Sequence, residues 1–167
     1  MLNITEVGIN DRVALCLAYT ERTLDYFRDE FKDGKYDAAF DKFDNIIKLG
    51  FDWLIGNKVD WEIIYNLCND DEQEYGCFNF VSSHECSDKY TIPTSILIWT
   101  IYYLIYQCAR QSNEQYFPSD LWDGNLPEEE EKEILETLNA EASKYLSSDV
   151  IEQLKLVESI YRKNLYG

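Results

Sequence analysis

Residues 92–106 have the sequence IPTSILIWTIYYLIY, the longest apolar stretch in this chain of 167 residues. A membrane-spanning helix needs about 20 apolar residues, whereas this stretch is shorter and is interrupted by Pro93 and three hydroxyl residues. It is apolar on almost every helical face, which indicates burial on most sides. The charges of residues 94–117 also cancel. The stretch therefore predicts a buried central helix, with Thr91 or Thr94 as its N-cap.

Apolar residues continue at the helical period on both sides of this stretch. Five further helices are expected, which begin near Asp11, Tyr36, Asp60, Pro127, and Ser147 or Ser148. Gly34 and Gly50 are expected to end the first two, although the apolar pattern continues from Gly50 to Ile55. The sequence thus predicts an all-α fold, a single domain over residues 1–167 with about six helices around the buried central one.

The helical period disappears between Asn69 and Tyr90, which predicts one long acidic loop with at most a short strand over residues 77–80. Loops this long are uncommon in compact domains and are usually functional. Aromatic side chains beside unpaired carboxylates suit a surface that receives Arg and Lys from a partner protein. The candidate binding residues are Asp70, Asp71, Glu72, Glu74 and Tyr75 in this loop, and Asp120, Trp122 and Asp123 in the link before Pro127. A merely solvated loop is the alternative, and Trp53, Trp61 and Trp99 are expected in the core.

The balance of charge restricts the classes of partner. The chain has 32 acidic and 15 basic residues, a formal net charge of −17 and a pI near 4.3. This charge opposes binding to nucleic acid or to an anionic membrane, and it favours a basic partner. With 46% hydrophobic residues the chain is not expected to be disordered. The first ten residues do not form a secretory signal, and five cysteines are an odd number, so reduced thiols in the cytoplasm are expected.

Catalytic chemistry has few candidates in this sequence. His84 is the only histidine, so a thiol-dependent site would have to combine it with Cys86 or Cys77. A zinc site could be imagined from Cys68, Cys77, His84 and Cys86, but only the last two have the close spacing of typical ligand pairs. A solvated histidine in a loop is the favoured interpretation. We therefore expect no catalytic residue, no metal and no cofactor, and a thiol or zinc enzyme centred on His84 and Cys86 stays as an alternative.

Several stretches together resemble immunity protein family six, the helical immunity proteins of bacterial polymorphic toxin and contact-dependent inhibition systems. The resembling stretches are residues 12–21 (RVALCLAYTE), 51–53 (FDW), 64–67 (IYNL) followed by Asn69-Asp70, 102–109 (YYLIYQCA) and 115–121 (QYFPSDL). The resemblance runs from about Asp11 to Ile160. The chain departs from the family at Phe51, where the family has the first Trp of a Trp-x-Trp motif, and at Tyr102, where it tends to have Ala.

The resemblance implies a cytoplasmic antidote that binds one cognate toxin domain, commonly a nuclease or a deaminase. Nuclease sites are basic because they hold phosphates, so an acidic protein could block such a site as an anionic decoy, and opposite charges would speed its capture. The resulting hypothesis is a monomeric, non-enzymatic immunity protein that forms a 1:1 complex with a basic nuclease toxin. A generic acidic adaptor or nucleic-acid mimic with many partners is a further alternative.

Overall fold

The computed structural model of the chain describes residues 8–69 and 76–114, together with Glu136 and Ala140. Over the two continuous ranges it contains five α-helices and no strand, and Glu136 and Ala140 are also helical. The helices are α1 (Ile9–Glu30), α2 (Asp37–Leu54), α3 (Trp61–Cys68), α4 (Cys77–His84) and α5 (Thr91–Gln111). The all-α prediction is confirmed. The helices expected after Pro127 and after Ser147 lie largely outside the described residues.

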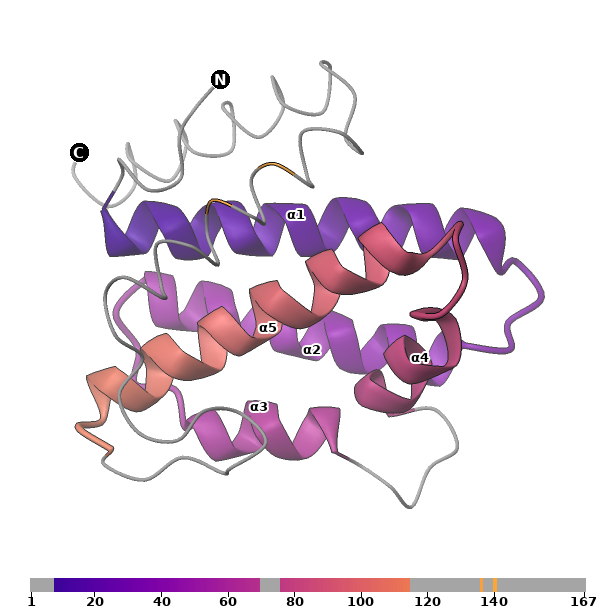
Figure 1. Cartoon of the computed structure of the whole chain (residues 1–167). Coiled ribbons are helices and arrows are strands. Elements are labelled where there is room, and N and C mark those ends of the chain that lie inside the picture. The colour runs from indigo at the N-terminus through magenta and orange to yellow at the C-terminus, as the bar shows by residue number, and fades with distance from the viewer. Residues whose placement is uncertain (1–7, 70–75, 115–135, 137–139, 141–167) are drawn as a thin grey trace.

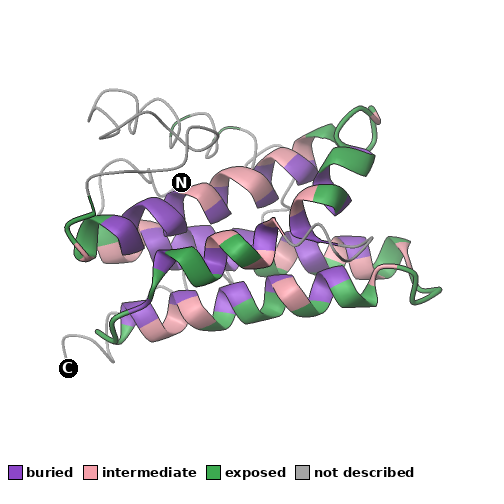
Figure 2. Ribbon diagram, turned by 90° about the horizontal axis from the view of Figure 1, so that it is seen from below, coloured by how far each residue is buried: buried purple, intermediate pink, exposed green. Residues whose placement is uncertain are grey.

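Three long helices make the body of the protein, and two short helices pack against them. α1 and α2 run side by side in opposite directions, and α5 crosses in front of them (Figure 1). α3 lies along the lower edge in this view, and α4 lies near the start of α5 (Figure 1). α2 and α5 each contact the other four helices. The buried residues therefore face inward from all five helices, as the purple bands of Figure 2 show.

Gly50 shows why α2 can lie so close to its neighbours. The prediction that this glycine ends the helix is wrong, because α2 continues through it to Leu54. A Cβ atom at Gly50 would lie 2.5 Å from Cδ2 of Leu17 in α1 and 3.2 Å from Cδ2 of Leu104 in α5. Both leucines are buried. The glycine is therefore a packing requirement between three helices rather than a helix terminator.

α5 is the helix that the apolar stretch 92–106 predicts, and it begins at Thr91. By length and composition it could cross a membrane, the only such helix among the described residues, but 72% of its most apolar window is buried inside the protein. A buried pair of hydroxyls joins it to α1, with 2.6 Å between Oγ1 of Thr20 and Oγ1 of Thr100. Such burial is the pattern of a core helix.

Of the N-caps expected from the sequence, Asp60 is observed, whereas α5 has Tyr90 as its N-cap residue, without a side-chain cap, in place of Thr91 or Thr94. Asp11 was expected to cap the first helix, but α1 already begins at Ile9 with Gly8 as the N-cap residue, and Asp11 lies in the first turn. A carboxylate there still interacts favourably with the positive end of the helix dipole. Asp60 does cap α3, because its Oδ1 accepts a hydrogen bond of 3.0 Å from the Glu62 backbone N–H.

α4 is the largest correction to the fold expected from the sequence. Residues 77–84 were predicted to belong to a long loop with a possible strand, yet they form two turns of helix. Four of them are buried at positions i, i+3, i+4 and i+7, namely Cys77, Phe80, Val81 and His84. The helical period was thus present in the sequence. It was hidden because one of the four buried positions holds a histidine, preceded by two serines.

The tryptophans divide between the core and its edge. Trp53 and Trp61 are buried, as expected. Trp99 was expected in the core as well, but it is only partly buried and packs edge-on against Tyr102, with 6.0 Å between ring centroids. The half-exposed residues of α5 follow one side of the helix before the fully buried run that begins at Tyr103.

Candidate functional site

The acidic segment that the sequence singles out lies between α3 and α4. The candidate binding residues Asp70, Asp71, Glu72, Glu74 and Tyr75 lie outside the described residues, and so do Asp120, Trp122 and Asp123. Both ends of the first segment, Asn69 and Gly76, are described. The structure therefore describes the residues on either side of this segment, and the contacts of its acidic side chains stay predictions.

Two buried thiols hold the ends of the acidic segment together. Cys68 is the last residue of α3 and Cys77 is the first residue of α4, and both are almost completely buried. A hydrogen bond between the two thiols, together with burial, raises the pKa of Cys68 well above its usual range. Both ends of the segment are thereby attached to one point of the core. Only six residues, 70–75, lie outside the described structure between Asn69 and Gly76.

Two buried N–H groups near α3 have no hydrogen-bond partner in the described structure. They are Nε1 of Trp53, near the end of α2, and Nδ2 of Asn69, which directly follows α3. A buried donor without a partner costs about 1–3 kcal/mol. The helix is nevertheless held firmly, because Trp61, Ile64 and Cys68 are all buried on its inner side.

His84 does not have the surroundings of a catalytic histidine. It was expected in a solvated loop, but it is 8% exposed and lies in the last turn of α4. Its Nδ1 lies 2.7 Å from the carbonyl oxygen of Phe80, a hydrogen bond in which the protonated ring nitrogen donates. The ring packs within an aromatic cluster that consists of Phe27, Phe31, Tyr36, Phe80 and Tyr90. Its position is that of an aromatic core residue.

The structure does not bring the imagined zinc ligands together. Cys68, Cys77, His84 and Cys86 are all described, and Cys86 is exposed whereas the other three are buried. Among the described residues no group of three or more His, Cys, Asp or Glu side chains could hold a metal ion. All five thiols are free. Cys68, Cys77, His84 and Cys86 thus do not form a set of metal ligands.

The outer faces of α1 and α2 carry an excess of negative charge. Partial burial raises the pKa of the Glu21 carboxyl, and the neighbouring carboxylates of Asp25 and Asp44 raise it further. Arg28 contacts both aspartates, at 3.7 Å from Asp25 and 2.7 Å from Asp44. These exposed ion pairs contribute little to stability. These ion pairs engage the cations of this surface, so acidic groups remain in excess on it.

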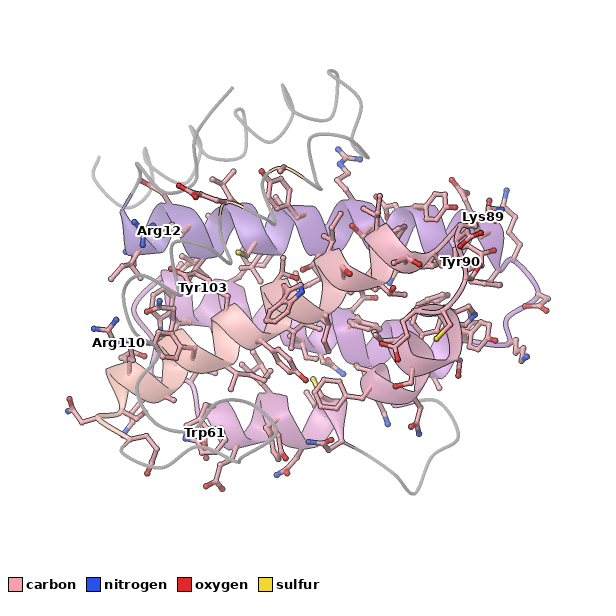
Figure 3. The ribbon with its side chains drawn as sticks, in the orientation of Figure 1. Arg12, Trp61, Lys89, Tyr90, Tyr103 and Arg110 are labelled. Atoms are coloured by element: carbon pink, nitrogen blue, oxygen red, sulfur yellow. The ribbon has the colours of Figure 1, made fainter. Side chains whose placement is uncertain are left out.

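The cations that Figure 3 labels lie at opposite ends of the bundle. Lys89 and Tyr90 lie together at the start of α5, where both side chains donate to the Glu30 carboxylate (Figure 3). Arg12 and Arg110 lie toward the other end, near the start of α1 and the end of α5 (Figure 3). The labelled cations are thus spread out and form no single basic patch, which agrees with the net charge.

Comparison with known proteins gives one result. A family model described as "Immunity protein Imm6" matches residues 11–145, which is most of the chain and spans all five helices except the first two residues of α1. No curated protein and no solved structure matches the chain. The match agrees with the resemblance carried by residues 12–21, 51–53, 64–67 and 102–109.

Proposed function

Since the chain belongs to the Imm6 family of immunity proteins, we propose that its partner is one basic nuclease toxin, whose substrate groove it blocks with an acidic surface. The family itself indicates an immunity protein against a toxin. The proposal adds the kind of toxin and the way in which it is blocked. It makes the chain a non-enzymatic binder that acts in the cytoplasm, where free thiols are usual, and that forms a 1:1 complex.

The observation that carries this proposal is the net charge of −17 on a chain of 167 residues. Four of the ten described cations, Arg22, Arg28, Lys32 and Lys89, lie within ion-pair distance of acidic side chains. Acidic groups therefore dominate what an approaching protein meets. Such a charge destabilises the folded chain through self-repulsion, and a basic partner would relieve that repulsion.

A nuclease groove is a suitable target for this surface, because it is lined by cations that hold phosphates. Carboxylates that enter the groove would make charge-assisted hydrogen bonds with the same cations and exclude the substrate. Long-range attraction between the opposite charges would also raise the association rate, by about 100-fold or more at low salt. Fast capture is useful for an antidote, since one active nuclease molecule can cleave many substrate molecules.

The segments proposed to enter the groove are residues 70–75, with Asp120, Trp122 and Asp123 as a second patch. Residues 70–75 follow α3 and precede α4 in the sequence, and the helix ends on either side of them meet at Cys68 and Cys77. Charge reversal by Asp71→Lys together with Glu74→Lys should slow association and leave the helical fold intact. The same change at Asp120 and Asp123 tests the second patch.

The proposal expects the coding sequence immediately upstream to encode a large secreted protein that ends in a small basic domain, and the purified form of that C-terminal domain provides the test. Its cleavage of RNA is measured while the chain is added, and association is measured at about 50 mM and about 500 mM salt. We expect complete inhibition at one chain per toxin domain and an association rate that falls steeply with salt. A toxin domain that cleaves no nucleic acid, or an association rate independent of salt, would contradict the proposal.

A further inference from the structure

The described residues expose three large apolar side chains, and two of them lie close together in the sequence. These two are Ile55, which is 64% exposed directly after α2, and Ile63, which is 51% exposed in the first turn of α3. The third, Ile9, is 44% exposed at the start of α1. A single exposed isoleucine needs no explanation. Two of them at either end of the turn that joins α2 to α3 mark a surface that could bind another protein.

The fold forces Ile63 outward. The inner side of α3 is occupied by Trp61, Ile64 and Cys68, which are buried at positions i, i+3 and i+7. The Asp60 cap fixes where the helix begins. Because successive residues are separated by about 100° around a helix, Ile63 could turn inward only if Trp61 and Cys68 left the core. Its exposure is therefore a stable property of the native state.

The exposed residues that neighbour Ile63 in the sequence are polar. Glu62 and Asn66 share the exposed side of α3 with it, and Asn57, Lys58 and Asp60 are exposed in the preceding turn. Among the described positions 52–69 the sequence contains three acidic residues and one basic residue, Lys58. An apolar side chain beside carboxylates, on a chain with a net charge of −17, is complementary to a basic surface that contains an apolar pocket.

We propose that the outer side of α3 is a docking surface for the basic toxin domain, with Ile63 as the apolar anchor and Glu62 and Asn66 beside it. This inference rests on the proposed function. It adds Ile63, a contact residue in a rigid helix, to the contacts proposed for the acidic segment after α3. α3 packs against α2, α4 and α5, so the anchor needs no ordering when the partner binds.

The test is the rate at which the toxin domain dissociates from two matched variants. Ile63→Ser removes the anchor without a change of charge. Ile9→Ser makes the same substitution at the exposed isoleucine at the start of α1. The probe is an inactivated form of the same C-terminal domain with which the proposed function is tested. We expect dissociation from Ile63→Ser to be about 10- to 100-fold faster than from wild type, and dissociation from Ile9→Ser to stay within about twofold.

A third variant separates the anchor from the surrounding charge. Glu62→Gln should slow association at low salt and change the dissociation rate little, because an acidic group at the rim acts mainly on the encounter. Circular dichroism and thermal unfolding of the free variants should match wild type, since all three positions are exposed. An Ile63→Ser variant that is destabilised would show that Ile63 belongs to the core, which would overturn the inference.

The outcomes also separate this inference from the proposed function. If wild type binds the toxin domain and Ile63→Ser binds with the same kinetics, the docking surface is elsewhere and only the α3 inference fails. If wild type does not bind the domain at all, the proposed function fails and the α3 inference with it. If wild type alone is a dimer in sedimentation and Ile63→Ser is a monomer, the surface serves a second copy of the chain instead of the toxin.

Discussion

α3 and α4 are both eight residues long, and they flank the same acidic segment, yet they differ in which of their residues the core buries. α3 is the more apolar of the two in sequence, but it leaves Ile63 exposed. α4 contains Asn, two Ser and His, but it buries the histidine inside an aromatic cluster. The more polar helix, α4, thus buries even its histidine in the core, whereas the more apolar helix, α3, leaves an isoleucine exposed.

The difference indicates separate roles for the two helices. Every residue that α4 buries has its partners inside the protein, which makes α4 part of the scaffold. α3 buries Trp61, Ile64 and Cys68 and leaves Ile63 exposed. On the docking surface proposed for the outer side of α3, Ile63 is the apolar anchor. Substitutions in α4 should therefore affect stability, and substitutions on the outer side of α3 should affect binding.

The largest effect is expected from Phe80→Ala in α4. The Phe80 ring is 1% exposed and lies with its centroid 4.6 Å from that of His84 and 5.0 Å from that of Phe27. Its removal leaves a cavity and should lower the free energy of unfolding by about 3–5 kcal/mol, as measured by urea denaturation. Phe78→Ala, in the same helix but half-buried, is the matched control and should cost clearly less. Equal losses would show that α4 does not bury the face described here.

The cysteines on either side of His84 should differ in reactivity by at least about 100-fold. Cys86 is exposed, whereas Cys16, Cys68, Cys77 and Cys108 are buried, and burial raises the pKa of Cys108 to about 12. A thiol reagent at mildly alkaline pH should therefore modify one thiol per native chain rapidly and all five after unfolding. In Cys86→Ser the rapid reaction should disappear. Rapid modification that persists in that variant would mean that the start of α4 opens easily.

The start of α3 should be sensitive to the loss of its cap. In Asp60→Ala the Glu62 backbone N–H loses its acceptor, so the free energy of unfolding should fall by about 1 kcal/mol. Asp60→Asn keeps an acceptor oxygen and should stay close to wild type. A loss of equal size in both variants would attribute the effect to the charge of Asp60 instead of the cap. α4 begins at Gly76 without a side-chain cap, so it offers no comparable substitution.

The smallest effect is expected at the ion pair between Glu30 and Lys89, which joins the end of α1 to the connection between α4 and α5. A hydrogen bond from Lys89 lowers the pKa of Glu30 below its usual value of 4.5. The folded state therefore favours the ionised carboxylate, and this stabilisation is present above the usual pKa and is lost as the pH falls through the lowered one.

Thermal unfolding of wild type and Glu30→Gln from about pH 7 to about pH 3 measures this contribution. The melting temperatures should differ slightly at neutral pH and converge at acidic pH, and high salt should reduce the difference because the pair is exposed. Lys89→Met should show the same convergence. A difference that stays constant with pH would show that the pair does not contribute through its charge.

Much of the architecture could be predicted from local patterns. The apolar stretch 92–106 predicted α5, the Asp60 cap predicted the start of α3, and the order of segments indicated the family that the match over residues 11–145 supports. These predictions succeed because helical period and capping depend on neighbours in the sequence. The acidic candidate residues follow from composition in the same way, and their contacts with a partner stay a prediction.

The sequence alone determined an acidic, all-helical chain of the immunity type, whereas tertiary packing decided the structural role of single residues. Gly50 looked like a helix end and proved to be the point where Leu17 and Leu104 meet α2. His84 looked solvated and proved to be buried among rings. Ile63 is one of the apolar residues of α3, and the packing of its neighbours leaves it exposed. The sequence pattern of a helix shows which of its faces are apolar, but only the helices packed around it determine which face is buried.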